Sequence, residues 1–532
     1  MRKIVTGLLL VFVLLLIACT GGKREERQKI SLPFSVEIHS LDPRKITEHS
    51  HSQISNMLYE GLMSHDELGG LSLGLAESFS INKEQTEYTF ILRDACWSNG
   101  MPITAYDVEY SWKGVLSHHL FSGNTTLMYF LKNAKKHMQG ECKISEIGVK
   151  ALNEKTLLVI LENPTPFFLE LLTVSIFKPV PNLIDERRKG WDTSFSQEIL
   201  TSGPFRIKHY QRGMGLTLEK NPNYWDQEVV SLNEIELVHI SDTQTQALLF
   251  KNKELDWYGQ PIGAFDGDAY ANIGQPEPVH HRPVYAVVWL QVNTENPILS
   301  NKNIRKALSY AINRQEIVNH VVKKRVVECN TFLPNTHGDE IEPLIVTEED
   351  ARQALEQGLT ELGLTKNELP PIELTYVQLG ANQKVAEVIQ NQVRETLGIQ
   401  ISLMNREWKI FLDAVARGSF QLAEIAWFSS YPDPSYFLYM FQDKGAKNNY
   451  SRWENKRYTE LTHMLTKEWR NEKRAIIIAE LNQIATEEFP VIPLFTTTYS
   501  YAMNPRLTNV VISEMGIADF KYAKLVNEEK AN

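Results

Sequence analysis

The longest apolar run of the chain stands at its N-terminus and limits what the rest can fold into. Arg2 and Lys3 precede it, and it covers Ile4 to Ala18, about 15 residues. That length suits the core of a signal peptide but falls short of the roughly 20 residues that span a bilayer as a helix. No second run of membrane length follows, so the remaining residues are expected to fold as a globular body in water.

The apolar run ends in Leu16-Ile17-Ala18-Cys19, which resembles the bacterial lipobox, where the cysteine thiol is diacylated and becomes the new N-terminus. The next residues, 20–29, are polar, charged and glycine-containing, which is typical of a flexible tether. We therefore expect a signal peptide at 1–18 and a tether at 19–29 that is lipidated at Cys19. The alternative is an ordinary secretory signal with a chance cysteine, and the choice between inner and outer membrane stays open.

Length and charge limit the architecture and the partners. A chain of 532 residues exceeds what one core usually supports, so two or more lobes are expected. The formal charge is −10, which becomes −12 (−10 minus 2) when Arg2 and Lys3 leave with the signal. An acidic chain without a basic stripe is a poor candidate for binding nucleic acid.

Few cysteines are left for structural use. With Cys19 assigned to lipid, Cys96, Cys142 and Cys329 remain, and three thiols allow at most one internal disulfide. Cys96 and Cys142 are the closer pair in sequence, but all three are equally compatible with ordinary buried thiols. Their spacing fits no zinc ribbon, so no metal site is expected from them.

Strand and helix patterns alternate along the chain. Residues 303–314 place Ile304, Ala307, Leu308, Ala311 and Ile312 on one helical face. Thr347 and Asp350 are spaced as a capping box for a helix that continues through Leu355. The strand-like segments are Tyr88 to Arg93, Thr156 to Leu161 and, after Pro370-Pro371, Ile372 to Tyr376. This alternation indicates α/β lobes.

A series of short segments keeps one order along almost the whole chain after the signal. They are Leu41-Asp42-Pro43, Tyr59 to Leu62, Leu75 to Ser78, Tyr88 to Arg93, Trp97 to Val108, Thr201 to Phe205, Asn221 to Trp225, Leu290 to Asn293, Ile304 to Leu308 and Pro490 to Leu494. Together they resemble the extracellular solute-binding proteins that serve peptide ABC importers. Asn405 to Asp413, and Ala426-Trp427 leading into Tyr431 to Pro434, resemble the ligand-lining segments of oligopeptide-binding members.

The resemblance implies an α/β, two-lobed periplasmic-binding-protein fold with crossing hinge strands and an additional inserted domain. The expected boundaries are 30–59, 184–285 and 501–532 for the first lobe, 60–183 for the inserted domain and 286–500 for the second lobe. Such a protein closes like a hinged trap around an oligopeptide and delivers it to membrane permease subunits. With the lipid anchor, it would sit on a membrane and face the periplasm or the exterior. No cofactor is expected.

The resemblance also implies which residues line the ligand cleft. A tryptophan is more often a core residue than a ligand platform, but Trp408 and Trp427 match cleft positions of relatives. An extended peptide can lie there as an added strand, and water can fill loose pockets around its side chains. The expected ligand-binding residues are Trp289, Gln291, Trp408, Glu424, Trp427, Phe428 and Ser430.

Two of these positions depart from the family pattern. Ser430 replaces an aspartate that pairs with the terminal ammonium of the peptide, and Glu424 replaces an arginine. A neutral hydroxyl lacks the strength of a carboxylate–ammonium bond, and six strand residues, about 20 Å, separate Glu424 from Ser430. Two hypotheses follow. Another carboxylate, such as Glu48 or Asp433, has taken over the anchor, or the ligand is a different class, such as a cell-wall peptide or a peptide lacking a free α-amine there.

Other functional classes find less support in the sequence. The motifs of serine hydrolases, zinc proteases and P-loop enzymes are missing, so no catalytic residue is expected. Family relatives include nickel and haem binders, but close histidine pairs lack the third ligand that a tetrahedral metal ion needs. The pairs are His49/His51, His118/His119 and His280/His281. The remaining alternatives are the same fold binding a cell-wall peptide, a dipeptide, nickel or haem, and a surface adhesin or chaperone.

Overall fold

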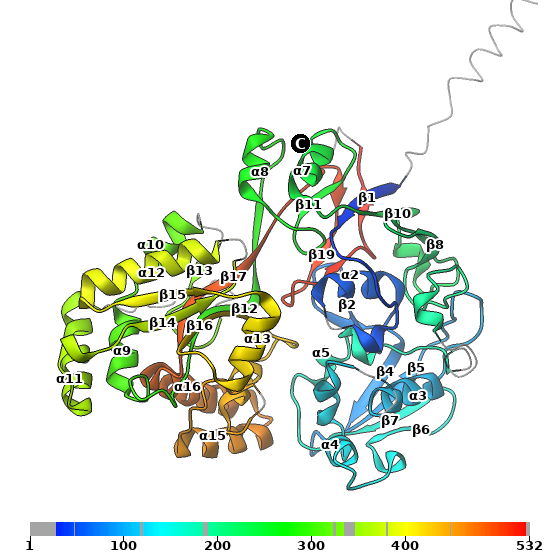
Figure 1. Ribbon diagram of the computed structural model, residues 1–532. Helices are drawn as coiled ribbons and strands as arrows, with labels where there is room; N and C mark the ends of the chain where they lie inside the picture. Colours follow the sequence, from blue (N-terminus) through cyan, green and yellow to red (C-terminus); the bar gives the residue numbers. More distant parts are fainter. Residues whose placement is uncertain are drawn as a thin grey trace, which may run out of the picture.

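The computed structural model describes residues 28–46, 48–117, 120, 122–182, 185, 190–322, 326–334, 346–378, 381–446 and 448–527. The predicted signal peptide, Cys19 and most of the tether lie outside these ranges. Within them, the chain forms two lobes that stand side by side, each with its own sheets and apolar core (Figure 1). No helix of the described residues is both long and apolar enough to span a bilayer.

The first lobe is built on a four-stranded sheet in the order β1-β10-β9-β8. β1 runs parallel to β10, and the other neighbours are antiparallel. Alternate residues such as Ile30 and Leu32 are fully buried and share one core with helix α2, as expected for a sheet with a single apolar face. The elements are β1 (Lys29–Phe34), α2 (His49–Leu58), β8 (Phe205–Gln211), β9 (Gly215–Lys220), β10 (Glu234–His239), α7 (Thr243–Lys251), β11 (Trp257–Gly259), α8 (Gly267–Asn272), β18 (Leu507–Thr508), β19 (Val511–Ile512), β20 (Ala518–Asp519) and β21 (Lys524–Leu525).

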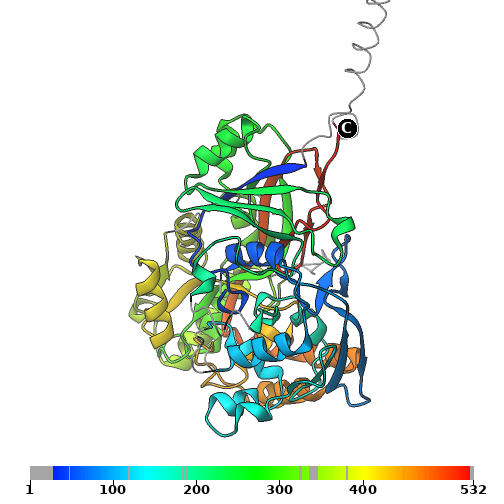
Figure 2. The same ribbon diagram turned by 90° about the vertical axis from the view of Figure 1, so that its right-hand side faces the viewer.

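An inserted domain follows α2 in the chain and lies below the first-lobe sheet (Figure 2). Its antiparallel sheet has the order β4-β5-β7-β6 and packs against α3. Trp112 of α3 is fully buried in that core, and its Nε1 donates to the Phe177 carbonyl at 2.8 Å. The elements are β2 (Met63–His65), β3 (Leu71–Leu73), β4 (Ala76–Ile81), β5 (Glu87–Leu92), α3 (Ala105–Val115), α4 (Ala134–Met138), β6 (Val149–Ala151), β7 (Thr156–Ile160) and α5 (Phe168–Leu171).

The second lobe is built around a seven-stranded sheet. Six strands follow the order β11-β17-β12-β16-β14-β15, and the seventh, β13, pairs with β17 beside them. Helices α9, α11 and α12 pack on one face and α13, α15 and α16 on the other, so its central strands are buried on both sides. The elements are β12 (His280–Val292), α9 (Lys302–Tyr310), α10 (Arg314–Glu316), β13 (Val327–Glu328), α11 (Glu348–Leu362), β14 (Ile372–Tyr376), α12 (Asn382–Leu397), β15 (Ile401–Asn405), α13 (Trp408–Arg417), β16 (Leu422–Phe428), α14 (Ser435–Leu438), α15 (Lys456–Lys467), α16 (Asn471–Glu488) and β17 (Val491–Met503).

Two long strands, β12 and β17, pass from one lobe to the other (Figure 1). At one end β17 pairs with β11 of the first lobe, and at the other β12 pairs with β16 of the second. The register between β12 and β17 shifts between Pro283 and Val287. Because the hydrogen-bond pairing of β12 with β17 is interrupted there, the backbone at this point can change conformation when the two lobes rotate towards each other.

Two local elements predicted from the sequence, the capping box at Thr347 and the strand from Ile372 to Tyr376, are confirmed. Thr347 Oγ1 accepts from the Asp350 amide at 3.2 Å at the start of α11, and Ile372 to Tyr376 forms β14 with the predicted bounds. The five apolar residues predicted on one helical face are all buried in the second-lobe core, but α9 ends at Tyr310, before the expected residue 314. The two-lobed α/β fold is also confirmed, while the numbered domain boundaries stay a prediction.

Candidate ligand-binding site

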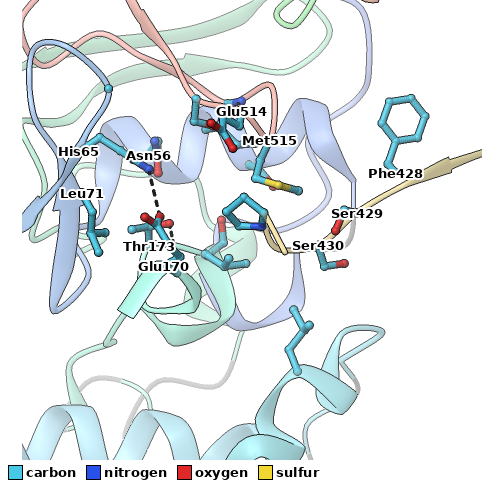
Figure 3. A pocket seen from close by; sticks show the side chains of 18 of the residues that line it. Asn56, His65, Leu71, Glu170, Thr173, Phe428, Ser429, Ser430, Glu514 and Met515 are labelled. Atoms are coloured by element: carbon cyan, nitrogen blue, oxygen red, sulfur yellow. Dashed lines mark hydrogen bonds and ion pairs between the residues drawn. The ribbon is translucent and has the colours of Figure 1, made fainter. Parts of the chain in front are cut away.

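A cavity of about 450 Å³ lies where the two lobes meet (Figure 3). The first lobe lines it with α2 and with the loop between β19 and β20. The inserted domain contributes the β2–β3 hairpin and residues 170–175, and the second lobe contributes residues 428–432, which follow β16. Because both lobes supply walls, the shape of this cavity depends on their relative position.

The turn after β16 is held firmly in this wall. The Ser429 amide donates to the Tyr285 carbonyl at 2.9 Å, and Ser429 Oγ accepts from the Tyr431 amide at 3.2 Å. Tyr431 stacks on Phe167 of the inserted domain, with ring centroids 4.4 Å apart. Ser430, between these two anchored residues, lines the cavity.

One edge of β16 is only partly paired. On one side it pairs with β12 from Leu422 to Phe428, but on the other side its pairing with β14 covers only Leu422 and Ala423. The following residues include Ala426, which is exposed, and Phe428, which lines the cavity. The backbone of residues 425–428 therefore presents an edge beside the cavity to which an extended chain can add.

The charged side chains that line the cavity are mostly acidic. Burial and the nearby carboxylate of Glu514 raise the pKa of Glu170. Burial and the positive charge of Lys178 lower the pKa of His65, whose Nε2 lies 3.9 Å from Glu170 Oε2. No lysine or arginine is among the described residues that form the wall. The charged and titratable side chains of the described wall are thus Glu170, Glu514 and His65.

The predicted ligand residues fall into two groups. Phe428 and Ser430 line the cavity, whereas the other five do not. Trp289 is fully buried and stacks on Phe332 with centroids 5.4 Å apart, and Trp427 packs against Tyr450. Gln291 is also fully buried, and its Nε2 donates to Ser451 Oγ at 2.5 Å.

The remaining two predicted residues differ in exposure. Trp408, the first residue of α13, is 51% exposed and stacks on Phe411. Glu424 is only 4% exposed, its Oε2 has no hydrogen-bond partner among the described residues, and burial raises its pKa to about 8. A ligand role for these residues stays a prediction.

Sequence reasoning did not single out His65, Glu170 or Glu514. Each stands in a different segment, without a motif or periodic pattern that marks it for chemistry. The fold brings them together from the β2–β3 hairpin, the end of α5 and the loop before β20.

The cysteines and histidines form no further site in the described part of the chain. Cys96, Cys142 and Cys329 are all free, so the Cys96–Cys142 bridge that the sequence left open is not formed. His280 stacks on Tyr501, while His118 and His119 lie outside the described residues. Among the residues described, no three His, Cys, Asp or Glu side chains are grouped so that they could hold a metal ion.

Comparison with known proteins agrees with this architecture. The chain is 33% identical to the oligopeptide-binding protein OppA of Bacillus subtilis, over 98% of this chain and 99% of that protein. The crystal structure of a periplasmic oligopeptide-binding protein (OppAIV) from Borrelia burgdorferi is similar, with a TM-score of 0.77 at 27% identity, covering 94% of this chain and 100% of that one. Listeria monocytogenes OppA bound to peptide gives a TM-score of 0.75 at 25% identity, with coverage of 94% and 100%.

A family model supports the same assignment. Residues 70–449 match the model of the bacterial extracellular solute-binding proteins, family 5 Middle. The matched region includes most of the inserted domain, much of the second lobe and most of the residues that line the cavity. The chain therefore belongs to the family 5 bacterial extracellular solute-binding proteins.

Proposed function

We propose that this protein captures oligopeptides between its lobes and delivers them to the permease of an ABC importer. The observation that carries the proposal is the edge of β16 that no described strand pairs beyond Ala423, beside a cavity that both lobes line. A peptide that adds to this edge as a strand is held through its backbone, so one site accepts many sequences. The names of the relatives, oligopeptide-binding proteins, support the same ligand class.

Binding and lobe closure are coupled in this mechanism. A ligand drives closure only when it binds the closed form better than the open one, which requires contacts from both lobes. The proposed second-lobe contacts are the half-exposed Trp408 and the partly buried Trp427, together with Phe428 and Ser430. The first lobe and the inserted domain supply the opposite wall. The role needs no catalytic group, and we assign none.

Small-angle X-ray scattering tests the closure. Because closure brings the lobes together, the radius of gyration is expected to fall when a saturating mixture of short peptides is added to the ligand-free protein. Native mass spectrometry of the same sample reports whether peptides are bound. Bound peptides with an unchanged radius of gyration would contradict the trap mechanism, and no bound peptide at saturation would contradict the ligand class.

We also propose that a lipid at Cys19 holds the protein on a membrane. The support is the sequence alone: the apolar run from Ile4 to Ala18, the small residue before the cysteine and the polar tether after it. Cys19→Ser is expected to move the protein from the membrane fraction to the soluble fraction of cells, and to abolish labelling by palmitate. A variant that still sediments with membranes and still takes up the label would contradict the assignment. Cys329→Ser, at a buried thiol, is the matched control and should leave labelling unchanged.

A further inference from the structure

Asn56 of helix α2 stands between two cavities. It lines the main cavity of about 450 Å³ and, together with His65 and Thr173, a neighbouring cavity of about 20 Å³ (Figure 3). Lys178 lines the smaller cavity and not the main one. The side chain of Asn56 thus has the ligand cavity on one side and a lysine on the other.

This lysine is buried and depends on Asn56 for its hydrogen bonding. Lys178 is 3% exposed, and its Nζ donates to Asn56 Oδ1 at 2.5 Å and to the Ser55 carbonyl at 3.4 Å. Burial lowers the pKa of Lys178 to about 8, while the negative charges of Asp519 and Glu60 limit the shift. The side chain is therefore mostly an ammonium at pH 7, and a buried ammonium needs acceptors such as the amide oxygen of Asn56.

The contact with Lys178 determines which way the amide of Asn56 points. An ammonium has three donors and no acceptor, so the oxygen of the amide must face it and the nitrogen must lie on the other branch. Nδ2 of Asn56 has no hydrogen-bond partner among the described residues. Because Asn56 is only partly buried and lines the main cavity, its two N–H groups are open to that cavity.

The hydroxyl groups near Asn56 already use their hydrogens within the protein. Ser52, one helical turn earlier on the same wall, donates from Oγ to the Glu48 carbonyl at 3.3 Å. Thr173 donates from Oγ1 to the Glu170 carbonyl at 2.8 Å. These hydroxyls offer a ligand only oxygen lone pairs, whereas Asn56 offers it N–H donors.

The two carboxylates that the sequence suggested as replacements for the missing aspartate do not line this cavity. Both oxygens of Asp433 accept from Arg474 Nη2 at 2.9 Å. Glu48 precedes α2, and its Oε2 lies 3.3 Å from His51 Nδ1. The polar contact that α2 offers a ligand is therefore the amide of Asn56 and not the carboxylate of Glu48.

We propose that Asn56 donates a hydrogen bond from Nδ2 to a carbonyl oxygen of the bound peptide, and that Lys178 is the positioning residue that holds the amide in the required orientation. This inference rests on the proposed function and adds to it a specific contact from the first lobe. The acceptor is either an amide carbonyl of the peptide backbone or its terminal carboxylate, since both offer oxygen lone pairs.

Asn56→Asp separates a ligand role from a structural one. Aspartate has nearly the same shape but presents an acceptor where asparagine presents a donor, so affinity for tetraalanine in calorimetry is expected to fall about 10-fold or more. The variant also gives Lys178 a carboxylate partner, so its stability in urea is expected to be unchanged or higher. A loss of affinity with stability retained does not come from misfolding.

Two further variants complete this comparison. Asn99→Asp is the matched control, because it makes the same charge change at an exposed site outside the cavity and should leave affinity unchanged. Asn99 Oδ1 accepts from the Met101 amide at 3.1 Å, which aspartate can also do. Asn56→Ala removes the amide altogether and is expected to weaken binding about 3- to 10-fold, which keeps the test valid when Asn56→Asp does not fold.

A double-variant cycle tests the positioning role of Lys178. Lys178→Met keeps a long unbranched side chain but removes the donor, so the amide of Asn56 can turn either way and affinity is expected to fall about 3- to 10-fold. In the Asn56→Ala background the same substitution should change affinity by less than about twofold, because the group that Lys178 positions is no longer there. Equal losses in both backgrounds would show a purely structural role and overturn the positioning part of the proposal.

The C-terminal amide of tetraalanine identifies the acceptor. When the acceptor is the terminal carboxylate, Asn56→Asp should weaken binding of the free acid more than that of the amide, because two negative charges then face each other. When the acceptor is a backbone carbonyl, both peptides should lose affinity equally.

The outcomes distinguish this inference from the proposed function. Unchanged affinity in both Asn56→Asp and Asn56→Ala overturns the contact and leaves peptide capture standing. When the wild-type protein does not bind tetraalanine, native mass spectrometry compares the same variants by the peptide that they retain from a random tripeptide mixture. A wild-type protein that retains no peptide overturns peptide capture itself, and the Asn56 contact with it.

Discussion

Glu424→Gln is expected to raise the free energy of unfolding at pH 7 by about 3 kcal/mol. Burial raises the pKa of Glu424 from the usual 4.5 of a glutamate to about 8. Between these two values the folded protein holds a proton that the unfolded chain releases. The stabilisation that comes from the protonated form of Glu424 is therefore complete below about pH 4.5 and is lost as the pH rises to about 8. Glutamine has nearly the same shape and does not titrate.

Urea unfolding of both proteins at a series of pH values measures this effect. The gain from Glu424→Gln should shrink to under about 1 kcal/mol at pH 5, because the unfolded chain then holds most of the proton too. Glu356→Gln, at an exposed carboxylate on α11, is the control and should change stability little at any pH. Parallel curves for the wild-type protein and Glu424→Gln from pH 5 to 8 would contradict the prediction. Peptide affinity of the same variant tests the predicted ligand role of Glu424.

Asp42→Ala is expected to lower the free energy of unfolding by about 3–5 kcal/mol, because it leaves a buried guanidinium short of its main partner. Asp42 and Arg44 are 1% and 2% exposed. Arg44 Nη2 lies 2.7 Å from Asp42 Oδ2 and 2.9 Å from Asp185 Oδ2, and the Arg44 amide also donates to Asp42 at 3.0 Å. Burial lowers the pKa of Arg44, but the two carboxylates outweigh it and hold the charge in place.

A double variant separates the unpaired charge from the lost contacts. Asp42→Ala with Arg44→Met should cost less than Asp42→Ala alone, since it removes the cation that the single variant leaves unpaired. Glu480→Ala breaks the exposed pair with Arg457 and should cost under about 1 kcal/mol. A double variant that is less stable than the single one would show that the packing of Arg44 matters more than its charge.

Local patterns predicted elements but not the cavity. The capping box at Thr347 and the strand after Pro370-Pro371 depend on residues within a few positions, so the sequence contains all the information needed. Glu170 and Glu514 are 344 positions apart in the sequence (514 minus 170), and they line the same cavity only because of how the inserted domain and the loop before β20 are arranged. No spacing in the sequence predicts this.

The family resemblance identified the correct fold. Of the ligand contacts that it predicts, Phe428 and Ser430 line the cavity, whereas Trp289 and Glu424 lie inside the second lobe, and a ligand role stays a prediction for all of them. Trp289 and Glu424 belong to β12 and β16, central strands of a sheet covered by helices on both faces, so most side chains of these strands are core residues. A strand can contribute its backbone edge to a ligand site while its side chains stay buried. The family motif Leu41-Asp42-Pro43 likewise does not mark a ligand contact, because Asp42 forms a buried ion pair with Arg44.

The order in which the two lobes can be completed follows from the way β17 returns to the first lobe. Residues 501–503 pair with β11, and Leu507, Ile512 and Phe520 complete the core beneath β1. The side chain of Gln28 exchanges two hydrogen bonds of 2.9 Å with the backbone of Leu525. The inserted domain and most of the second lobe are complete in the nascent chain before these residues emerge from the ribosome. The first lobe, although it begins first, is therefore finished last, so the nascent chain stays partly open until the end of translation.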